Sequence, residues 1–307
     1  MTLRSLLLAA AVCCCAQGAH AASAPMRFCD RPAPMSAQQQ DRLLRFAALM
    51  KQELEGSGAT VALVARSGLD LSRFGLRYSH AGVSLRASGN APWSVRQLYY
   101  ACDEQKPRLF DQGLAGFVFG TDDPAVGFVS IVLPSGAAAA ELERAASDTA
   151  RALRLLAAAY SANAYPYSVS YQNCNQWVAE LLATAWGPLD DAPDLRVRAQ
   201  RWLAGRGYEP AAIDVGSRWL LLAAPFVPLI HLDDHPQEDL SALRVRTSLP
   251  PAIEAFVHER VPGASRIEMC HDGPKAVIRR GWEPFAQGCR AQAGDRTLDL
   301  DGDAALE

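Results

Sequence analysis

The sequence predicts an α+β fold in which a mostly antiparallel sheet packs against helices and a C-terminal α+β extension packs on the same domain. Three observations support this. Strand-like runs follow one another between residues 60 and 133, separated by turn residues such as Ser88-Gly89-Asn90. Segments with apolar residues at helical spacing stand on both sides of these runs. Of the 307 residues, 50% are hydrophobic, which is sufficient for a substantial core.

The first predicted element is a helix over residues 37–54. Ser36 precedes it as a suitable N-cap, and Gly56-Ser57-Gly58 ends it. Its apolar residues recur at roughly helical spacing: Leu43, Leu44, Phe46, Ala47 and Met50. Strands are predicted next, at residues 60–65, 78–85, 93–100 and 128–133.

Helical patterns dominate the middle of the chain. An Ala-rich segment predicts one long helix over residues 137–160. A second helix is predicted to begin at Asn173-Cys174 and to end before Gly187-Pro188, and a third covers residues 195–204. The remaining predictions are a strand at 243–247, a helix at 252–260, and strands at 267–270 and 275–280.

The first residues predict export. Arg4, an apolar run over residues 6–16 and the sequence Ala19-His20-Ala21 form a signal peptide pattern with cleavage after Ala21. The apolar run is shorter than the roughly 20 residues that span a bilayer. We therefore expect a signal peptide at 1–21, a main domain at 22–215 and the extension at 216–307, in a protein that is periplasmic or secreted.

Composition argues against some functions. A formal net charge of −3 does not favour nucleic-acid binding, which usually requires excess Lys and Arg. The later apolar stretch at 219–232 is short and contains Pro225 and Pro228, so no membrane span is expected in the mature chain. No pattern calls for a cofactor.

Cysteine chemistry follows from export. Three of the 8 cysteines lie in the predicted leader, and an odd number remains in an oxidising compartment. The remaining ones are Cys29, Cys102, Cys174, Cys270 and Cys289. We prefer the pairs Cys270–Cys289 and Cys29–Cys102 with Cys174 free, although other pairings of these residues stay open.

Cys174 and His80 form the candidate chemistry. Cys174 stands where a helix begins, and a helix N-terminus favours a thiolate, so we expect a pKa below the free-thiol value of about 8.5. His80 begins a strand beside the small residues Ala81 and Gly82, which would let a thiol or substrate approach. A cysteine hydrolase or acyltransferase needs such a thiol and imidazole pair.

Two short motifs carry a family resemblance. Ser79-His80-Ala81-Gly82-Val83 on a strand, and later Asn173-Cys174 at a helix start, resemble the circularly permuted NlpC-type papain-like fold. That group includes relatives of bacterial cell-wall peptidases and of lecithin-retinol acyltransferase. The resemblance covers residues 61–186 at most, and the chain as a whole also resembles an exported bacterial family without an assigned function.

The resemblance implies a papain-like domain with assigned roles. His80 would be the base, Cys174 the nucleophile, and Gln97, on the next strand, the residue that orients the imidazole. The reaction would be hydrolysis or acyl transfer at an amide or ester bond. Cell-envelope peptides are one substrate class, and lipids and lipoproteins are others.

Each residue also has a simpler interpretation. A cysteine of an exported protein is commonly half of a disulfide, a strand histidine is commonly structural, and a strand glutamine such as Gln97 commonly faces solvent. The rival hypothesis is therefore a non-catalytic envelope-binding or scaffold protein that retains the fold.

Two further groups of residues have side chains of the kinds found in functional sites. His231, Asp233, Asp234 and His235 are metal-ligand residue types, but Pro236 favours a loop with surface or capping roles over a metal site. The aromatic residues Tyr99, Tyr100, Tyr171 and Trp177 could line a cleft beside the thiol. We expect most of them in the core, with Trp177 on the buried face of its helix.

Overall fold

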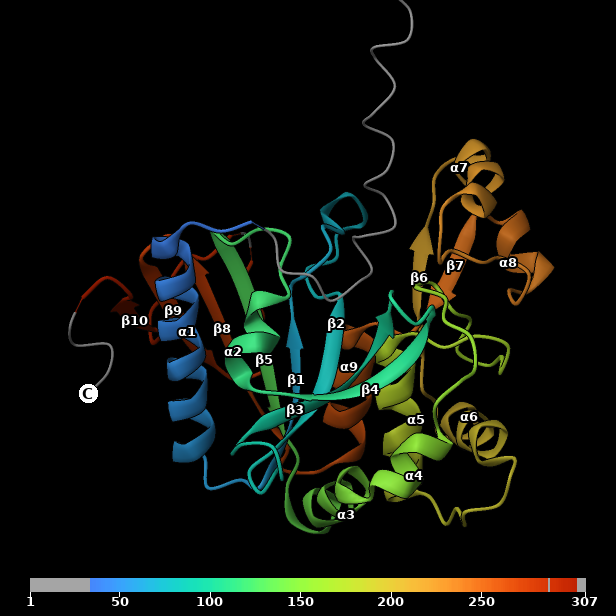
Figure 1. Ribbon diagram of the computed structural model, residues 1–307, viewed down its shortest axis with the longest axis horizontal. Helices are drawn as coiled ribbons and strands as arrows, with labels where there is room; N and C mark the ends of the chain where they lie inside the picture. Colours follow the sequence, from blue (N-terminus) through green and yellow to red (C-terminus); the bar gives the residue numbers. More distant parts are fainter. Residues whose placement is uncertain (1–33, 287, 303–307) are drawn as a thin grey trace, which may run out of the picture.

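The computed structural model describes residues 34–286 and 288–302, and Figure 1 shows their arrangement. An 8-stranded sheet has the order β10-β9-β8-β5-β1-β2-β3-β4, and every neighbouring pair is antiparallel. Its strands are β1 (Val61–Arg66), β2 (His80–Leu85), β3 (Ser94–Ala101), β4 (Lys106–Gln112), β5 (Val126–Leu133), β8 (Ser265–Asp272), β9 (Lys275–Arg280) and β10 (Arg296–Asp299). A separate 2-stranded ribbon pairs β6 (Ala211–Asp214) with β7 (Arg244–Thr247).

Helices cover both faces of the sheet. They are α1 (Ala37–Gly56), α2 (Leu114–Phe119), α3 (Gly136–Ser147), α4 (Thr149–Arg154), α5 (Cys174–Trp186), α6 (Leu195–Gly205), α7 (Arg218–Ala223), α8 (Gln237–Ser241) and α9 (Pro250–Arg260), with short 3-10 helices η2 (Ser72–Phe74) and η3 (Ala224–Phe226). The ribbon, α7 and α8 form an arm that extends beyond the end of the sheet (Figure 1).

The central strand β1 shows why the chain forms three layers. Its residues alternate between two cores: Leu63 packs with α5 on one side, and Val64 packs with α1 on the other. A strand buried on both faces needs an almost continuous apolar sequence, and all six residues of β1 are buried. In β2, the same alternation places Ala81 on the α5 side, while His80 approaches Phe117 of α2 on the other side.

The predicted α+β class is confirmed. Helix α1 begins after Ser36, whose side chain and that of Gln39 form a capping box. Helix α5 has the predicted limits, with Asn173 as its N-cap. The papain-like assignment itself remains a proposal.

The single helix predicted over residues 137–160 was wrong. The chain forms α3, breaks at Asp148 and begins again as α4, because the Asp148 side chain accepts a hydrogen bond from the Arg151 amide and caps the second helix. Strand β4 was not predicted, since its sequence is charged and its side chains are mostly exposed at the sheet edge.

The segment after residue 216 supplies strands to the main sheet. β8 pairs with β5 along its whole length, and β9 and β10 extend the sheet from there. No helix in the described ranges is both long and apolar enough to cross a membrane. The predicted signal peptide at 1–21 lies outside the described residues.

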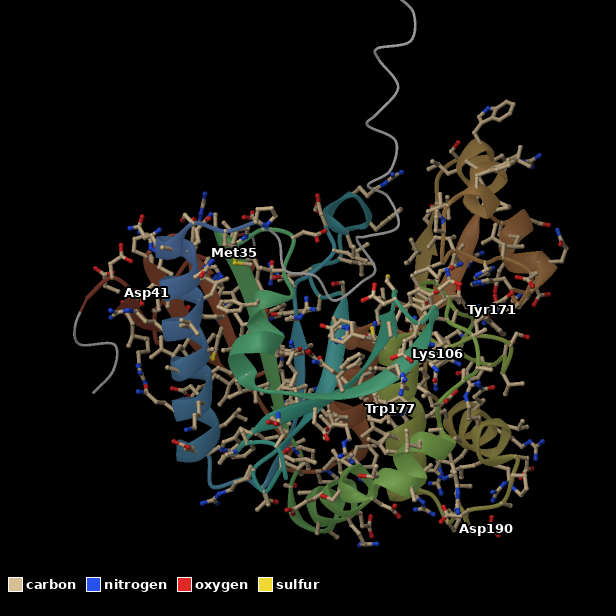
Figure 2. All side chains as sticks on the ribbon, viewed as in Figure 1. Met35, Asp41, Lys106, Tyr171, Trp177 and Asp190 are labelled. Atoms are coloured by element: carbon tan, nitrogen blue, oxygen red, sulfur yellow. A yellow bond between two sulfur atoms is a disulfide. The ribbon has the colours of Figure 1, made fainter. Side chains whose placement is uncertain are left out.

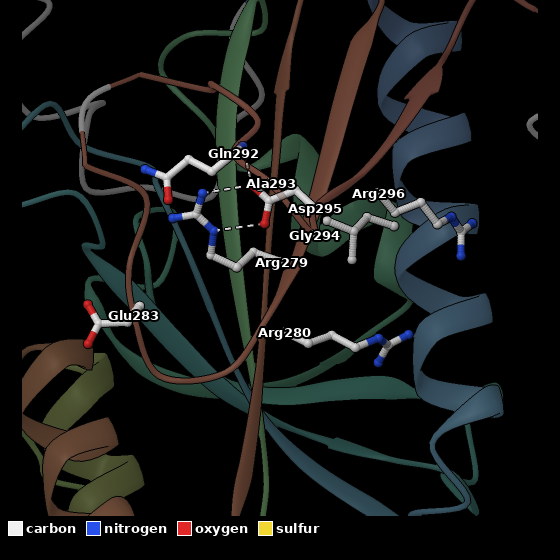
Figure 3. Close-up of a pocket in the computed structure, with 9 residues that line it drawn as sticks. Arg279, Arg280, Glu283, Gln292, Ala293, Gly294, Asp295 and Arg296 are labelled. Atoms are coloured by element: carbon white, nitrogen blue, oxygen red, sulfur yellow. Dashed lines mark hydrogen bonds and ion pairs between the residues drawn. The ribbon is translucent and has the colours of Figure 1, made fainter.

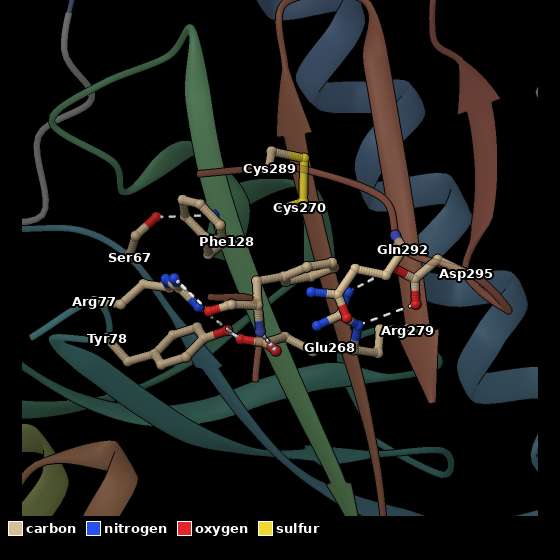
Figure 4. The surroundings of a disulfide bond; sticks show 11 residues. Ser67, Arg77, Tyr78, Phe128, Glu268, Cys270, Arg279, Cys289, Gln292 and Asp295 are labelled. Atoms are coloured by element: carbon tan, nitrogen blue, oxygen red, sulfur yellow. Dashed lines mark hydrogen bonds and ion pairs between the residues drawn. A yellow bond between two sulfur atoms is a disulfide. The ribbon is translucent and has the colours of Figure 1, made fainter. Parts of the chain in front are cut away.

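A buried carboxylate joins the C-terminal strands to the strand that carries His80 (Figure 4). Glu268 of β8 is fully buried and accepts hydrogen bonds from the Tyr78 hydroxyl at 2.5 Å and the Phe285 amide at 2.8 Å. Arg77 and Arg266 each form an ion pair with it at 3.2 Å. The network therefore holds residues 77–78, immediately before β2, against β8.

The disulfide prediction is confirmed for one pair. Cys270 and Cys289 are bonded across 19 residues of sequence (Figure 4). Cys102 is also disulfide-bonded, and its predicted partner, Cys29, lies outside the described residues. Cys174 is the free cysteine of the described chain.

Candidate active site

The N-terminus of α5 is fixed by its cap. The Asn173 side chain accepts a hydrogen bond from the Gln176 amide at 2.7 Å, and its Nδ2 donates to Thr247 Oγ1 at 2.9 Å. One residue therefore caps the helix and ties it to β7 at the base of the arm. This arrangement places Cys174 as the first residue of α5 in a buried position.

The Cys174 sulfur is surrounded by apolar groups and by backbone donors. Burial raises the pKa of the Cys174 thiol to about 11, while the Arg66 charge and the backbone N–H groups of Asn175, Ala81 and Cys174 itself lower it. The sequence-based expectation of a lowered pKa was wrong, because the cost of removing a thiolate from water exceeds the benefit of the helix N-terminus. The resting thiol is protonated at neutral pH.

His80 is held by a chain of amides. Its Nε2 lies 2.9 Å from Gln97 Oε1, and Gln97 Nε2 donates to Gln112 Oε1 at 2.7 Å. With the Gln97 amide oriented in this way, Nε2 of His80 is the donor and Nδ1 keeps its lone pair. Burial, with a further contribution from Arg66, keeps the pKa of His80 well below its usual value, so the imidazole is neutral.

Cys174 lies against the backbone on both sides of His80. The Ala81 N–H is directed at the sulfur, and Asn175 Nδ2 donates to the Ser79 carbonyl at 3.0 Å. Within the described chain, however, the imidazole makes no hydrogen bond to the sulfur: it binds Gln97, stacks on Tyr99 at 4.4 Å and approaches Phe117. The structure thus joins His80 to Gln97 and brings Cys174 to the same strand segment.

The small residues Ala81 and Gly82 of β2 have structural roles that differ from the expected one, which was to leave room for a thiol or substrate. Ala81 supplies its amide to the thiol. A side chain at Gly82 would instead collide with Val95 and crowd Gln97 of β3. Gly82 therefore permits β3 to approach β2, which keeps Gln97 within reach of His80.

Arg66 is a site residue that the sequence analysis missed. It is 5% exposed, ends β1 opposite His80 in the register, and forms no ion pair with any described carboxylate. Its guanidinium lies against Gly120, donates to the Gly120 carbonyl and to the Tyr99 hydroxyl, and leaves Nε without a partner. The only signal was a charged residue at the end of the apolar run Val61-Ala62-Leu63-Val64-Ala65.

Arg66 is a buried cation without a counter-ion among the described residues, and its charge should influence the ionisation of the Cys174 thiol. We expect Arg66→Met to raise the pKa of Cys174 further, because the Arg66 charge favours the thiolate, and to reduce the alkylation rate of Cys174 about tenfold below that pKa. Iodoacetamide labelling of the Cys174 peptide from neutral to alkaline pH measures this. Arg66→Lys keeps the charge and should retain most of the alkylation rate. Equal rates in Arg66→Met and the unmodified protein would show that the charge of Arg66 does not influence Cys174.

The predicted aromatic residues are divided between site and core. Tyr99 stacks on His80, and the rings of Tyr100 and Tyr160 lie 5.6 Å apart. Tyr160 is partly buried, and its pKa is raised by desolvation and by Cys174. Trp177 of α5 is fully buried, as expected (Figure 2). Tyr171 packs on His231, in the loop of the arm between η3 and α8.

The cluster at residues 231–235 forms a loop, and its side chains form hydrogen bonds and a ring contact with residues 163–171. His231 stacks on Tyr171 at 4.3 Å, and Asp233 accepts a hydrogen bond from the same residue. The Tyr165 amide donates to Asp234, and His235 Nε2 lies 2.9 Å from the Asn163 carbonyl. Over the described ranges, no group of three or more His, Cys, Asp or Glu side chains has a metal-binding arrangement.

A pocket of about 270 Å³ lies far from this chemistry, beside β9 and β10 (Figure 3). Arg279 and Asp295 form an ion pair at 2.7 Å across it, and Arg280 and Arg296 reach Glu53 of α1. The three arginines of the pocket therefore already have carboxylate partners.

The fold and the site define an α+β protein with a free, buried cysteine at a helix start, next to a strand whose histidine is hydrogen-bonded to a glutamine of the neighbouring strand. Residues 53–257 match the model of a family described as an uncharacterized protein conserved in bacteria (DUF2145), and the chain belongs to that family. No curated protein and no solved structure matches the chain significantly.

Proposed function

We propose that the protein is an exported thiol hydrolase or acyltransferase that acts on an amide or ester bond through Cys174 and His80. The observation that carries this proposal is the convergence of backbone N–H groups on the sulfur of a free cysteine, which lies against the strand segment that carries a neutral, hydrogen-bonded histidine. The same resemblance that implied a permuted papain-like fold supports these roles.

The proposed reaction begins from a neutral pair. Nδ1 of His80 takes the thiol proton while the sulfur attacks the carbonyl carbon, and the imidazolium then protonates the leaving group. The amides at Ala81 and Asn175 stabilise negative charge at this point, on the sulfur first and on a carbonyl oxygen next to it. Because thiol and imidazole are not hydrogen-bonded at rest, we propose that substrate binding brings them into contact.

Gln97 acts as a positioning residue in this scheme. Its carbonyl fixes the imidazole tautomer and leaves Nδ1 available, but its neutral amide cannot balance the charge of an imidazolium as a carboxylate would. Water or an amine finally resolves the thioester. Cell-envelope peptides, lipids and lipoproteins are the substrate classes that export would make accessible.

The rival function, a non-catalytic envelope-binding scaffold, has one observation in its favour. Burial keeps the Cys174 thiol protonated, with a pKa of about 11, and such a thiol is a poor nucleophile until it loses its proton. The two functions differ in whether Cys174 can be acylated.

The deciding experiment uses an activated ester as the probe. With p-nitrophenyl acetate, we expect an acetyl thioester on the Cys174 peptide, detected by mass spectrometry and released by hydroxylamine. His80→Ala should slow its formation about 10²- to 10⁴-fold, the usual contribution of a general base. His258, which stacks on Trp282 in another part of the molecule, offers a matched control, and His258→Ala should have no effect. Absence of the adduct would favour the scaffold function.

A further inference from the structure

The arm ends in an exposed group of large apolar side chains, here called the apolar tip. The tip comprises Trp219, Leu220, Leu222, Phe226 and Val227, which are 79%, 39%, 64%, 87% and 40% exposed. These residues belong to α7 and η3 or follow directly, and neither helix buries any residue. α7 stands at the outer end of the arm, away from the main sheet (Figure 1).

Such a surface is unusual for a folded domain. A large exposed apolar side chain costs free energy in water, and a contiguous group of them marks a surface that binds something. Elsewhere the described chain has scattered examples, such as Leu44 and Leu153 at 48% and 51% exposure. Among the residues that the structure describes, only the arm has five such side chains within nine positions of sequence.

Two features identify the occupant. The tip is a short protrusion, whereas a stable protein interface takes roughly 20–30 residues from each side. Its charge is also distinctive, because Arg218 is the only charged residue between Val215 and Leu232. A protruding Trp and Phe with a single cation and no carboxylate suit the boundary between lipid headgroups and acyl chains.

We infer that the apolar tip inserts into the surface of a lipid bilayer and docks the protein there peripherally. The inference does not require catalysis by Cys174, but it bears on the site. The segment after the tip is bonded to the connection between α4 and α5, since the Ala162 amide donates to the Leu229 carbonyl at 2.8 Å. At the base of the arm, Thr247 is bonded to Asn173, the cap of α5. Docking would therefore hold Cys174 at a fixed position relative to the membrane.

Vesicle sedimentation tests the inference. The probe is a vesicle of phosphatidylethanolamine and phosphatidylglycerol, and the variants are Trp219→Ala/Phe226→Ala and the control Leu44→Ala/Leu153→Ala. All proteins share one N-terminal sequence, so its contribution is the same in each. We expect the tip variant to lose binding about tenfold or more, the control to bind as the unmodified protein does, and both to keep its melting temperature.

The other outcomes are equally informative. Unchanged binding by the tip variant, or no sedimentation of the unmodified protein, overturns the inference. If the unmodified protein is instead a dimer on gel filtration and the tip variant a monomer, the tip is an interface between two copies. The Cys174→Ala protein should bind vesicles normally, which separates failure of docking from failure of the proposed catalysis.

Discussion

Cys174→Ser is expected to reduce turnover of an activated ester by about 10³-fold or more. Replacement of a nucleophile that acts with its base as one unit usually costs at least this much. Here the reason is specific: a serine hydroxyl is far less acidic than a thiol, and burial together with Arg66 makes His80 a weak base. The pair can move a thiol proton at much lower cost than a hydroxyl proton.

The measurement is the steady-state hydrolysis of a chromogenic ester, with the melting temperature as a control for folding. Serine is close to cysteine in size, so the apolar surroundings of residue 174 should remain intact. Cys174→Ala should be equally inactive. Retention of more than a tenth of the turnover by Cys174→Ser would show that the activity arises elsewhere on the protein.

The second large effect concerns stability. Glu268→Gln is expected to lower the free energy of unfolding by about 1.5–3 kcal/mol, because it removes a buried carboxylate that pairs with both Arg77 and Arg266. Arg266 keeps Glu254 as a partner at 2.9 Å, whereas Arg77 has no other ion pair in the described chain. The loss should therefore be felt most at residues 77–78, which lead into His80.

Urea unfolding monitored by tryptophan fluorescence provides the free energy. Glu104, an exposed residue paired with Arg108 at the sheet edge, supplies the matched control, and Glu104→Gln should leave the midpoint unchanged. If Glu268→Gln costs less than about 1 kcal/mol, hydrogen bonds from Tyr78 and Phe285 satisfy the amide, and the charge of residue 268 is not required.

Local features of the sequence were sufficient for much of this protein. Apolar periodicity predicted α1 and α5, and single capping residues, Ser36 and Asn173, marked where they begin. Alternating or continuous apolar runs predicted β1, β2, β3 and β5 to within a few residues. The free Cys174 and the Cys270–Cys289 bond followed from counting cysteines and from their spacing. Each of these features is determined by residues that lie close together in the sequence.

Only the tertiary structure decided how the site is charged and what surrounds it. Arg66, His80 and Gln97 meet because β1, β2 and β3 are adjacent in the sheet, and no local pattern records that adjacency. The pKa of Cys174 depends on how much water the surrounding layers exclude, so a helix start alone predicted the wrong direction. The exposure of Trp219 and Phe226 was hidden for the same reason: burial is a property of the packed molecule, and an apolar run in sequence is the same whether it faces the core or the solvent.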